Sequence, residues 1–330
     1  MKQAEEIRSY IEKEILPYLE EEENTRLSIL KILRKNKWIG FFTGFAFSLI
    51  AGILFFPAAI LGPFIGLLTY LIKTGNRANN FRTQFRINLK NNVISKMIAF
   101  LDSELTYSWK DHVHLREFLQ SGLYPELNFN NIYYTGDDHV KGMIDKTYVE
   151  FSEITARSGP PKKAENNLQN YFHGFFFLAD FNKNFSGRTF IFPDFPEEKY
   201  GSFIAENFQS FINSQKTYGV KENQIRLEDP EFEKLFSVFS SDETEARYIL
   251  SPSFMEKLTT FRKQTGIPLR ISFVNSKIFI VIPVASELFE MDPFKPVNNL
   301  NLLHNFADDF IFAMGITDEL NLNTRIWSKL

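Results

Sequence analysis

The sequence predicts an α+β protein, in which an N-terminal two-helix transmembrane hairpin with long flanking helices precedes a mostly antiparallel-sheet cytoplasmic domain. Three observations predict this class: an uncharged run from Trp38 to Ile72, helical spacing of apolar residues on both sides of it, and strands beyond about Tyr107 that do not alternate singly with helices. We expect four segments: a charged helical segment over 1–37, the hairpin over 38–72, an amphipathic connecting helix over 73–106 and the α+β domain over 107–330.

The composition of the 330 residues limits the classes of function. The net charge of −3 produces no global field that attracts nucleic acid, so no nucleic-acid partner is expected. The absence of cysteine excludes disulfides, thiolate ligands and a cysteine nucleophile. Because residues 1–37 are highly charged, we expect no cleavable signal peptide.

The run from Trp38 to Ile72 contains no Asp, Glu, Lys, Arg or His. One membrane crossing needs about 20 residues, so the run is too long for one crossing and just long enough for two short ones. Pro57 divides it into two usable pieces, whereas a division at Gly62-Pro63 would leave the second piece too short. A single kinked span and a buried hairpin of a soluble protein are the alternatives. We expect the chain to turn back near Pro57.

Basic residues on both sides of this run support two crossings. They are Lys31, Arg34, Lys35 and Lys37 before it, and Lys73, Arg77, Arg82 and Arg86 after it. Positive flanks tend to stay in the cytoplasm, and two cytoplasmic flanks require an even number of crossings. The expected location is therefore the bacterial inner (cytoplasmic) membrane, with multi-pass topology, both termini cytoplasmic and the lipid bilayer as a partner.

Apolar residues recur at helical spacing in both flanking segments. Ile7, Ile11 and Ile15 do so before the membrane, and the stripe after it comprises Phe81, Phe85, Leu89, Val93, Ile94, Met97, Ile98, Leu101 and Leu105. The second stripe either packs on other parts of the protein or lies near anionic lipid. We favour packing on the protein.

The region beyond Tyr107 shows strand patterns and clear helix boundaries. The expected strands are Lys146–Ile154, Tyr171–Phe181 and Arg188–Phe195, with a helix over Lys199–Phe211. Asp242 and Glu245 resemble a capping arrangement, Ser251-Pro252 begins another helix, and Gly266 ends it. A hairpin follows, with strands Leu269–Val274 and Lys277–Val284 joined at Asn275-Ser276, and a closing helix over 298–316.

Four separated motifs resemble a known family. They are "SGLYPE", "GMIDKTYVEFSEI", "FHGFFFLADFNKNFSGRTFIFPD" and "LEDPEFEKLFSVFSSDETEARYILSPSFMEKL". Together they resemble a bacterial, membrane-anchored family catalogued as domain of unknown function 3137, from about Tyr107 to the end of the chain. The resemblance implies two membrane spans ahead of a cytoplasmic region, and it implies no reaction, substrate or cofactor.

Polar residues in these motifs form a candidate binding surface: Asp180, Asn182, Lys183, Glu228, Asp229, Glu245 and Arg247. Paired carboxylates can act as acid and base or hold a cation. A structural explanation is favoured for each, with Asp229 capping a short helix before Pro230, Glu245 and Arg247 forming an ion pair, and "ADFNK" forming a turn. His112 and His114 are a weak candidate for a metal pair, because no third ligand is close in the sequence.

The sequence contains no Gly-rich phosphate loop, G-x-S-x-G elbow or H-E-x-x-H motif. We therefore expect no catalytic residue, no cofactor and no metal. The favoured function is a non-enzymatic, membrane-anchored binding or scaffolding module that associates with a protein partner or with itself. The alternative is a membrane-bound enzyme or ligand sensor with an acidic, arginine-lined pocket. A channel or transporter is less favoured, because the run lacks any charge.

Overall fold

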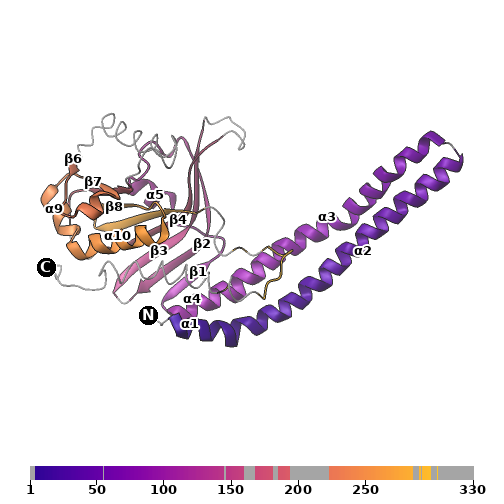
Figure 1. Cartoon of the computed structure of the whole chain (residues 1–330), viewed down its shortest axis with the longest axis horizontal. Coiled ribbons are helices and arrows are strands. Elements are labelled where there is room, and N and C mark those ends of the chain that lie inside the picture. Colours follow the sequence, from indigo (N-terminus) through magenta and orange to yellow (C-terminus); the bar gives the residue numbers. More distant parts are fainter. Residues whose placement is uncertain are drawn as a thin grey trace. The chain divides into compact units, whose positions relative to one another are not determined.

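A computed structural model describes residues 4–54, 56–144, 146–159, 168–180, 185–193, 223–284, 290, 292–298 and 303 (Figure 1). The chain forms two compact units. The first comprises residues 1–97 and 289–308, and the second comprises residues 98–288 and 309–330. Each unit is described by itself.

The first unit is built on two long helices that lie side by side (Figure 1). Its elements are α1 (Ala4–Tyr10), a π-helical turn (Ile11–Ile15), α2 (Leu16–Leu54), a 3₁₀ segment (Phe56–Leu61), α3 (Gly62–Leu89) and a second π-helical turn (Lys90–Ile94), which continues into α4 (Ser95–Leu101). Ile7, Ile11 and Ile15 are buried, as their spacing predicts for the inner face of a helix.

The helical hairpin differs from the expected one in its turn and in its second helix. Pro57 lies in the 3₁₀ segment between α2 and α3, but α3 begins only at Gly62, with Pro63 in its first turn. Proline is favoured there because its missing N–H has no partner in a helix that is just starting. The uncharged part of α3 therefore covers only Gly62–Ile72.

The expected connecting helix over 73–106 is not a separate element. Residue 73 lies inside α3, and the helical path ends at Leu101. Asp102 then accepts a hydrogen bond from the backbone N–H of Glu104 (2.9 Å), which forms a turn. Leu105, the last member of the predicted stripe, is the first residue of a strand. Leu101 and Leu105 are both buried, but Leu101 ends a helix and Leu105 begins a strand, so their spacing of four residues is not helical.

The second unit contains a nine-stranded antiparallel sheet, ordered β1-β2-β3-β4-β9-β8-β5-β7-β6. Its strands are β1 (Leu105–Ser108), β2 (Ile132–Ile144), β3 (Thr147–Ser158), β4 (Gln169–Asp180), β5 (Thr189–Pro193), β6 (Asn223–Ile225), β7 (Phe236–Ser240), β8 (Arg270–Val274) and β9 (Lys277–Pro283). The α+β class with antiparallel pairing is thus confirmed. The β8–β9 hairpin turns at Asn275 and Ser276, whose φ angles are 53° and 56°.

Four described helices accompany this sheet: α5 (Leu115–Gln120), α8 (Pro230–Glu233), α9 (Glu243–Ile249) and α10 (Pro252–Thr265). Ser251 caps α10 through the backbone N–H of Phe254, with Pro252 at its start. Gly266 ends α10 in the left-handed region, at φ 68°. The helix expected over Lys199–Phe211 lies outside the described residues, and the closing helix over 298–316 lies almost entirely outside them.

One face of the sheet carries a phenylalanine-rich core. Phe118, Phe176 and Phe279 are at most 1% exposed, and Phe118 and Phe176 meet edge to face with ring centroids 5.2 Å apart. Phe176 stacks on Phe279 at 6.2 Å. Phe176 and Phe279 therefore pack across strands β4 and β9, which pair directly.

Candidate functional site

Asp229, which directly precedes α8, caps this helix. Asp229 accepts hydrogen bonds from the backbone N–H groups of Glu231 (2.9 Å) and Phe232 (3.1 Å). Glu233 turns back to accept from the N–H of Leu227 (2.6 Å), and Glu228 is exposed. This geometry agrees with the capping explanation and gives Asp229 a structural role.

Glu245 and Arg247 do not pair with each other. The carboxylate of Glu245 accepts hydrogen bonds from the backbone N–H groups of Ser186 (2.8 Å) and Gly187 (2.7 Å), which are far away in the sequence. Arg247 pairs with Glu243 one turn earlier on α9 (2.9 Å) and donates to the carbonyl of Arg226 (2.8 Å). The predicted ion pair between Glu245 and Arg247 is wrong, because side chains two residues apart on a helix point in different directions.

The remaining residues of the predicted binding surface are Asp180, Asn182 and Lys183, and the structure describes only the first of them. Asp180 is the exposed last residue of β4, whereas Asn182 and Lys183 lie outside the described residues. Asp242 caps α9 through the N–H of Glu245 (3.0 Å), as its spacing predicts.

The two histidines of "DHVH" have separate local partners. His114 caps α5 by accepting from the backbone N–H of Arg116 (3.1 Å). The Nδ1 of His112 lies 3.0 Å from the carbonyl of Val113. The metal pair considered from the sequence therefore has no support in this geometry.

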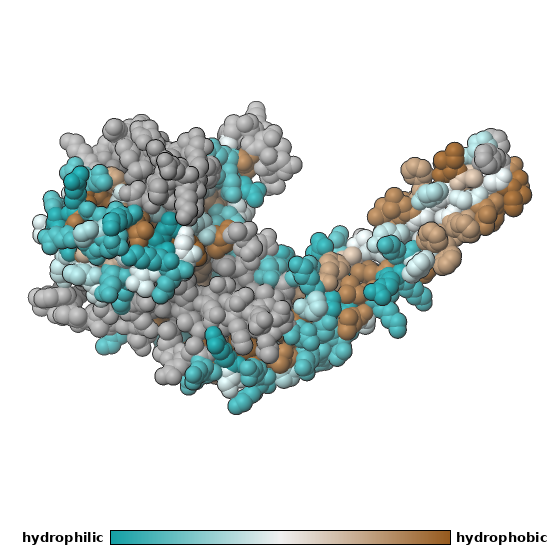
Figure 2. Space-filling model, in the orientation of Figure 1, coloured by the Kyte–Doolittle hydropathy of each residue, from teal (hydrophilic) through white to brown (hydrophobic). Residues whose placement is uncertain are grey.

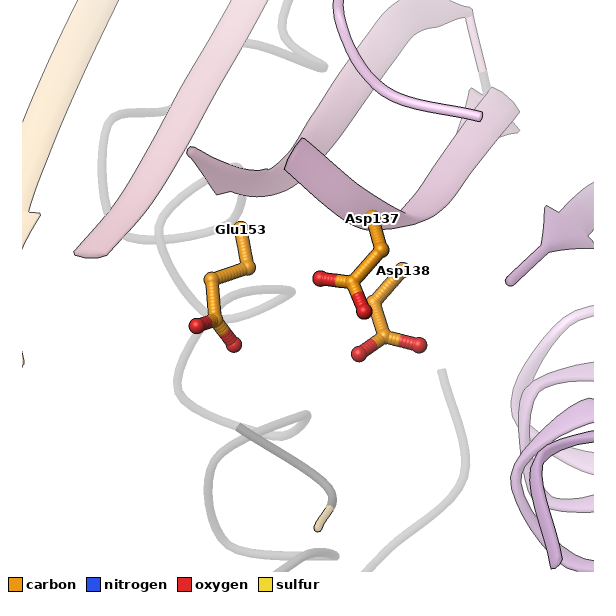
Figure 3. A group of neighbouring side chains, drawn as sticks. All are labelled: Asp137, Asp138 and Glu153. Carbon is orange, nitrogen blue, oxygen red and sulfur yellow. The ribbon is translucent and has the colours of Figure 1, made fainter. Parts of the chain in front are cut away.

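A group of three carboxylates that sequence reasoning missed lies on strands β2 and β3. Asp137 pairs with Glu153 across the two strands, and the register shifts between Asp137 and Val140. This bulge places Asp138, with φ at 55°, beside them. Carboxylate oxygens of Asp137, Asp138 and Glu153 lie within 4.8 Å of one another, and Figure 3 shows the three side chains extending to the same side of the strands.

Two of these carboxylates are buried. Asp138 is 1% exposed and accepts a hydrogen bond from the hydroxyl of Tyr107, and Glu153 is 5% exposed. The Nε2 of His173 lies 3.5 Å from Glu153, while its Nδ1 lies 2.9 Å from the hydroxyl of Thr155. Oxygen ligands of this kind suit a hard divalent cation such as Ca²⁺ or Mg²⁺. The signal in the sequence was the adjacent pair of aspartates within a strand, where buried charge is unusual.

A partly buried pair of polar residues lies on the same strands. The Nε2 of His139 is 2.8 Å from the carboxylate of Glu150, which also accepts from the hydroxyl of Tyr148 (3.1 Å). Burial raises the pKa of Glu150, but the hydrogen bond and charge of His139, together with Tyr148, outweigh it and leave this pKa below its ordinary value.

The first unit presents a different feature, an apolar tip shared by α2 and α3. Figure 2 shows hydrophobic residues gathered at this end of the two helices. Exposed large side chains there include Trp38, Phe41, Phe42, Phe45, Ile50, Ile53, Leu54, Ile60, Leu61, Phe64, Leu67, Leu68, Leu71 and Ile72. Ile53 and Leu54 are 85% and 80% exposed, respectively. A surface of this extent needs a partner that removes it from water.

Among the described residues, one helix is long and apolar enough to cross a membrane, and it covers Glu5–Leu54. Only 17% of its most apolar window is buried within the protein. A core helix of a soluble protein would be mostly buried. α3 does not meet the same criterion, because its uncharged part ends at Ile72 and is followed by Lys73 and Arg77.

Glycines bring α2 and α3 into close contact in the apolar segment. A Cβ atom at Gly44 would lie 2.6 Å from the carbonyl oxygen of Gly62, and one at Gly66 would lie 2.7 Å from that of Gly40. Both helices therefore carry glycines four residues apart on the faces that meet, an arrangement typical of helix pairs in membranes. Ser48 adds a hydrogen bond to the carbonyl of Ala59 (2.9 Å). These glycines form two Gly-x-x-x-Gly motifs in the sequence, Gly40–Gly44 and Gly62–Gly66.

Comparison with known proteins gives a family and a weak structural likeness. The curated proteins contain no match to this chain. Among solved structures, the crystal structure of the mycobacterial trehalose monomycolate transport factor A, TtfA, is similar with a TM-score of 0.35 and 10% sequence identity. The likeness covers 73% of this chain and 99% of that chain.

Residues 170–322 match the family described as "Protein of unknown function (DUF3137)". The match includes the two longer motifs noted in the sequence, whereas "SGLYPE" and "GMIDKTYVEFSEI" lie before it. Residues 170–322 are therefore similar to the DUF3137 family, and the resemblance that the motifs predict is confirmed over these residues.

Proposed function

We propose that this chain is a membrane-anchored binding or scaffolding module, in which the α2–α3 hairpin enters the bilayer and holds the α+β domain on the cytoplasmic side. The observation that carries the proposal is the apolar tip of the hairpin, whose side chains are exposed while its two helices are already packed against each other. Exposed apolar side chains that surround a closely packed helix pair suit lipid as their surroundings.

The proposed topology has two crossings, with the first formed by α2 and the second by the 3₁₀ segment and the start of α3. The second crossing is short, since Phe56–Ile72 provides fewer residues than the approximately 20 that span an average bilayer. Short spans are accommodated by local thinning of the bilayer and by flanking basic residues that reach the interface. Lys73 and Arg77 occupy that position after the second crossing, and Lys35 and Lys37 do so before the first.

The role of the α+β domain is proposed to be binding rather than catalysis. Asp229 caps α8, Glu245 accepts hydrogen bonds from backbone N–H groups, and Arg247 pairs with Glu243. These local roles do not support the acidic, arginine-lined pocket of an enzyme or sensor. The partner would be a protein or a second copy of this chain. Native mass spectra of the gently extracted full chain test this: a defined oligomer or a stoichiometric protein partner is expected, whereas a retained metabolite or nucleotide would favour the alternative.

Single cysteines test the topology, because the chain has no cysteine of its own. The variants are Ser28→Cys before the run, Ile60→Cys at the turn and Asn79→Cys after the run. In intact bacterial cells, a membrane-impermeant maleimide should label Ile60→Cys alone, and lysis should expose the other two. Labelling of Ser28→Cys and Asn79→Cys on opposite sides would indicate a single span. Recovery of the chain in the soluble fraction after an alkaline wash would overturn the membrane anchor.

A further inference from the structure

Between α2 and α3, beyond the basic end of the apolar tip, lies a groove of about 490 Å³. Its apolar lining comes from both helices and comprises Ile29, Ile32, Leu33, Phe81 and Phe85. Phe81 and Phe85 are 8% and 3% exposed, whereas Ile32 is 44% exposed. The volume falls within the range of ~300–1,000 Å³ that is typical of sites for small apolar ligands.

The groove begins close to the proposed membrane surface. Leu33 precedes Trp38 by five helical residues, and Arg77 follows Ile72 by the same interval, which corresponds to about 7.5 Å along each helix. Headgroup layers extend roughly 5–8 Å beyond the hydrocarbon core on each side. If the tip lies in the bilayer, this end of the groove therefore opens at the depth of the lipid headgroups.

The two ends of the groove carry opposite charges. Arg77 lies at the end near the membrane and is exposed, whereas Glu22 lies at the opposite end. An arginine at headgroup depth attracts anionic lipid. A carboxylate at the far end disfavours the reverse orientation, in which a negative headgroup would lie there.

The length of the groove matches a lipid chain. From Glu22 to Leu33, α2 rises by about 16 Å, which is close to half of the ~30 Å hydrocarbon core and thus to the reach of one acyl chain. We propose that the groove takes one acyl chain of an anionic phospholipid, whose headgroup lies beside Arg77 while its other chain stays in the bilayer. The proposal rests on the proposed membrane anchor.

The test uses the full chain in phosphatidylcholine vesicles that contain phosphatidylglycerol with a photoactivatable diazirine near the end of one acyl chain. After illumination, mass spectrometry of peptides locates the attached lipid. The expected result is labelling of residues 22–33 and 77–88 in addition to the tip at 38–72. Labelling of the tip alone would overturn the groove proposal and leave the membrane anchor standing. Labelling of neither region would overturn both.

Matched variants separate the groove from the surrounding surface. Ile29→Trp fills the groove, whereas Leu27→Trp places the same side chain on α2 at a position that is 50% exposed and does not line the groove. We expect Ile29→Trp to lower groove labelling relative to tip labelling several-fold and Leu27→Trp to leave this ratio unchanged. Leu33→Trp is the second filling variant, in case Ile29→Trp does not fold. Equal ratios in filling and control variants would overturn the proposal.

The headgroup preference is tested at Arg77. Replacement of the phosphatidylglycerol probe by the corresponding phosphatidylcholine probe should lower groove labelling by about fivefold, equivalent to about 1 kcal/mol for one basic residue near the surface. Arg77→Glu should remove this preference, whereas Arg34→Glu, which changes a charge of α2 outside the groove lining, should retain it. Disulfide-linked dimers of an Ile29→Cys variant without lipid labelling would instead identify a second copy of the chain as the occupant and overturn the proposal.

Discussion

The Nζ of Lys90 lies 3.1 Å from the Oε1 of Glu290, and the side chain of Lys90 is 1% exposed. Lys90 begins the π-helical turn after α3, while Glu290 comes from the segment that follows the sheet in the sequence. Two further contacts attach this segment to the helices: the N–H of Val297 donates to Glu23 (3.1 Å), and the guanidinium of Arg82 lies 5.1 Å from the ring centroid of Phe294. Residues from a distant part of the chain therefore pack on the helices of the first unit and belong to it.

Removal of one partner from this ion pair should destabilise the first unit. We expect Glu290→Ala to lower the free energy of unfolding by about 2 kcal/mol, below the ~3–5 kcal/mol of fully buried pairs because Glu290 is 23% exposed. Chemical denaturation of the full chain in detergent, followed by limited proteolysis near α3, measures this. Lys96→Met, which removes an exposed lysine six residues further along the helix, is the control. Equal effects of the two variants would contradict the prediction.

The cap at Asp229 gives a second prediction. Asp229→Ala removes the acceptor for two backbone N–H groups at the start of α8 and should cost about 1 kcal/mol of stability. The adjacent exposed acid provides a matched control, since Glu228→Ala should leave the midpoint of denaturation unchanged. If both variants lose binding of a partner while retaining full stability, the two residues belong to a recognition surface instead.

Glu231 links α8 to α10 and predicts a dependence on pH. Hydrogen bonds from Lys234 and then from Lys263 lower its pKa from the ordinary 4.5 to about 2. A carboxylate whose pKa is lowered on folding stabilises the protein above its unfolded pKa, and this contribution is lost as the pH falls from about 4.5 towards 2. Glu231→Gln should therefore weaken the decrease in melting temperature over this interval. Lys263→Met should do so in part, and a profile unchanged in both variants would contradict the link.

Local signals predicted those parts of the fold that depend on neighbouring residues. The caps at Asp242 and Ser251, the end of α10 at Gly266 and the β8–β9 hairpin follow from residues within a few positions of one another. The sheet order did not, because β4 pairs with β9 across roughly a hundred residues and no short pattern encodes that choice. Likewise, the contact between Lys90 and Glu290 joins two segments with no common motif.

The candidate sites show the same division. Asp137 and Asp138 are adjacent in the sequence, but Glu153 joins them only through the bulge in β2 and its register with β3, which no short pattern encodes. The partner predicted for Glu245 was wrong, because its hydrogen-bond donors, the N–H groups of Ser186 and Gly187, lie before β5 and far from Glu245 in the sequence. The apolar tip could be predicted, since it depends on composition alone.

The glycine contacts of the hairpin lead to the last prediction. At Gly44, a Cβ atom would lie 2.6 Å from the carbonyl oxygen of Gly62, and backbone cannot move aside as a flexible side chain does. Gly44→Ala should therefore separate α2 from α3 and cost about 1–3 kcal/mol, as overpacking does elsewhere. At Gly52, the nearest atom to an added Cβ is 3.5 Å away, so Gly52→Ala should fit and supplies the control.

Cross-linking measures this separation directly. Cysteines introduced at Ala51 and Ala59, near the turn, and at Lys37 and Lys73, near the basic end, report the approach of the two helices at each level. In the Gly44→Ala background, we expect slower disulfide formation between positions 37 and 73 and little change between positions 51 and 59, because the short connection holds the turn together. Equal rates in the Gly44→Ala and Gly52→Ala backgrounds would show that glycine is not required for the packing of the hairpin. The close backbone contact of α2 and α3 at these glycines would then no longer support the proposal that the hairpin crosses the membrane twice.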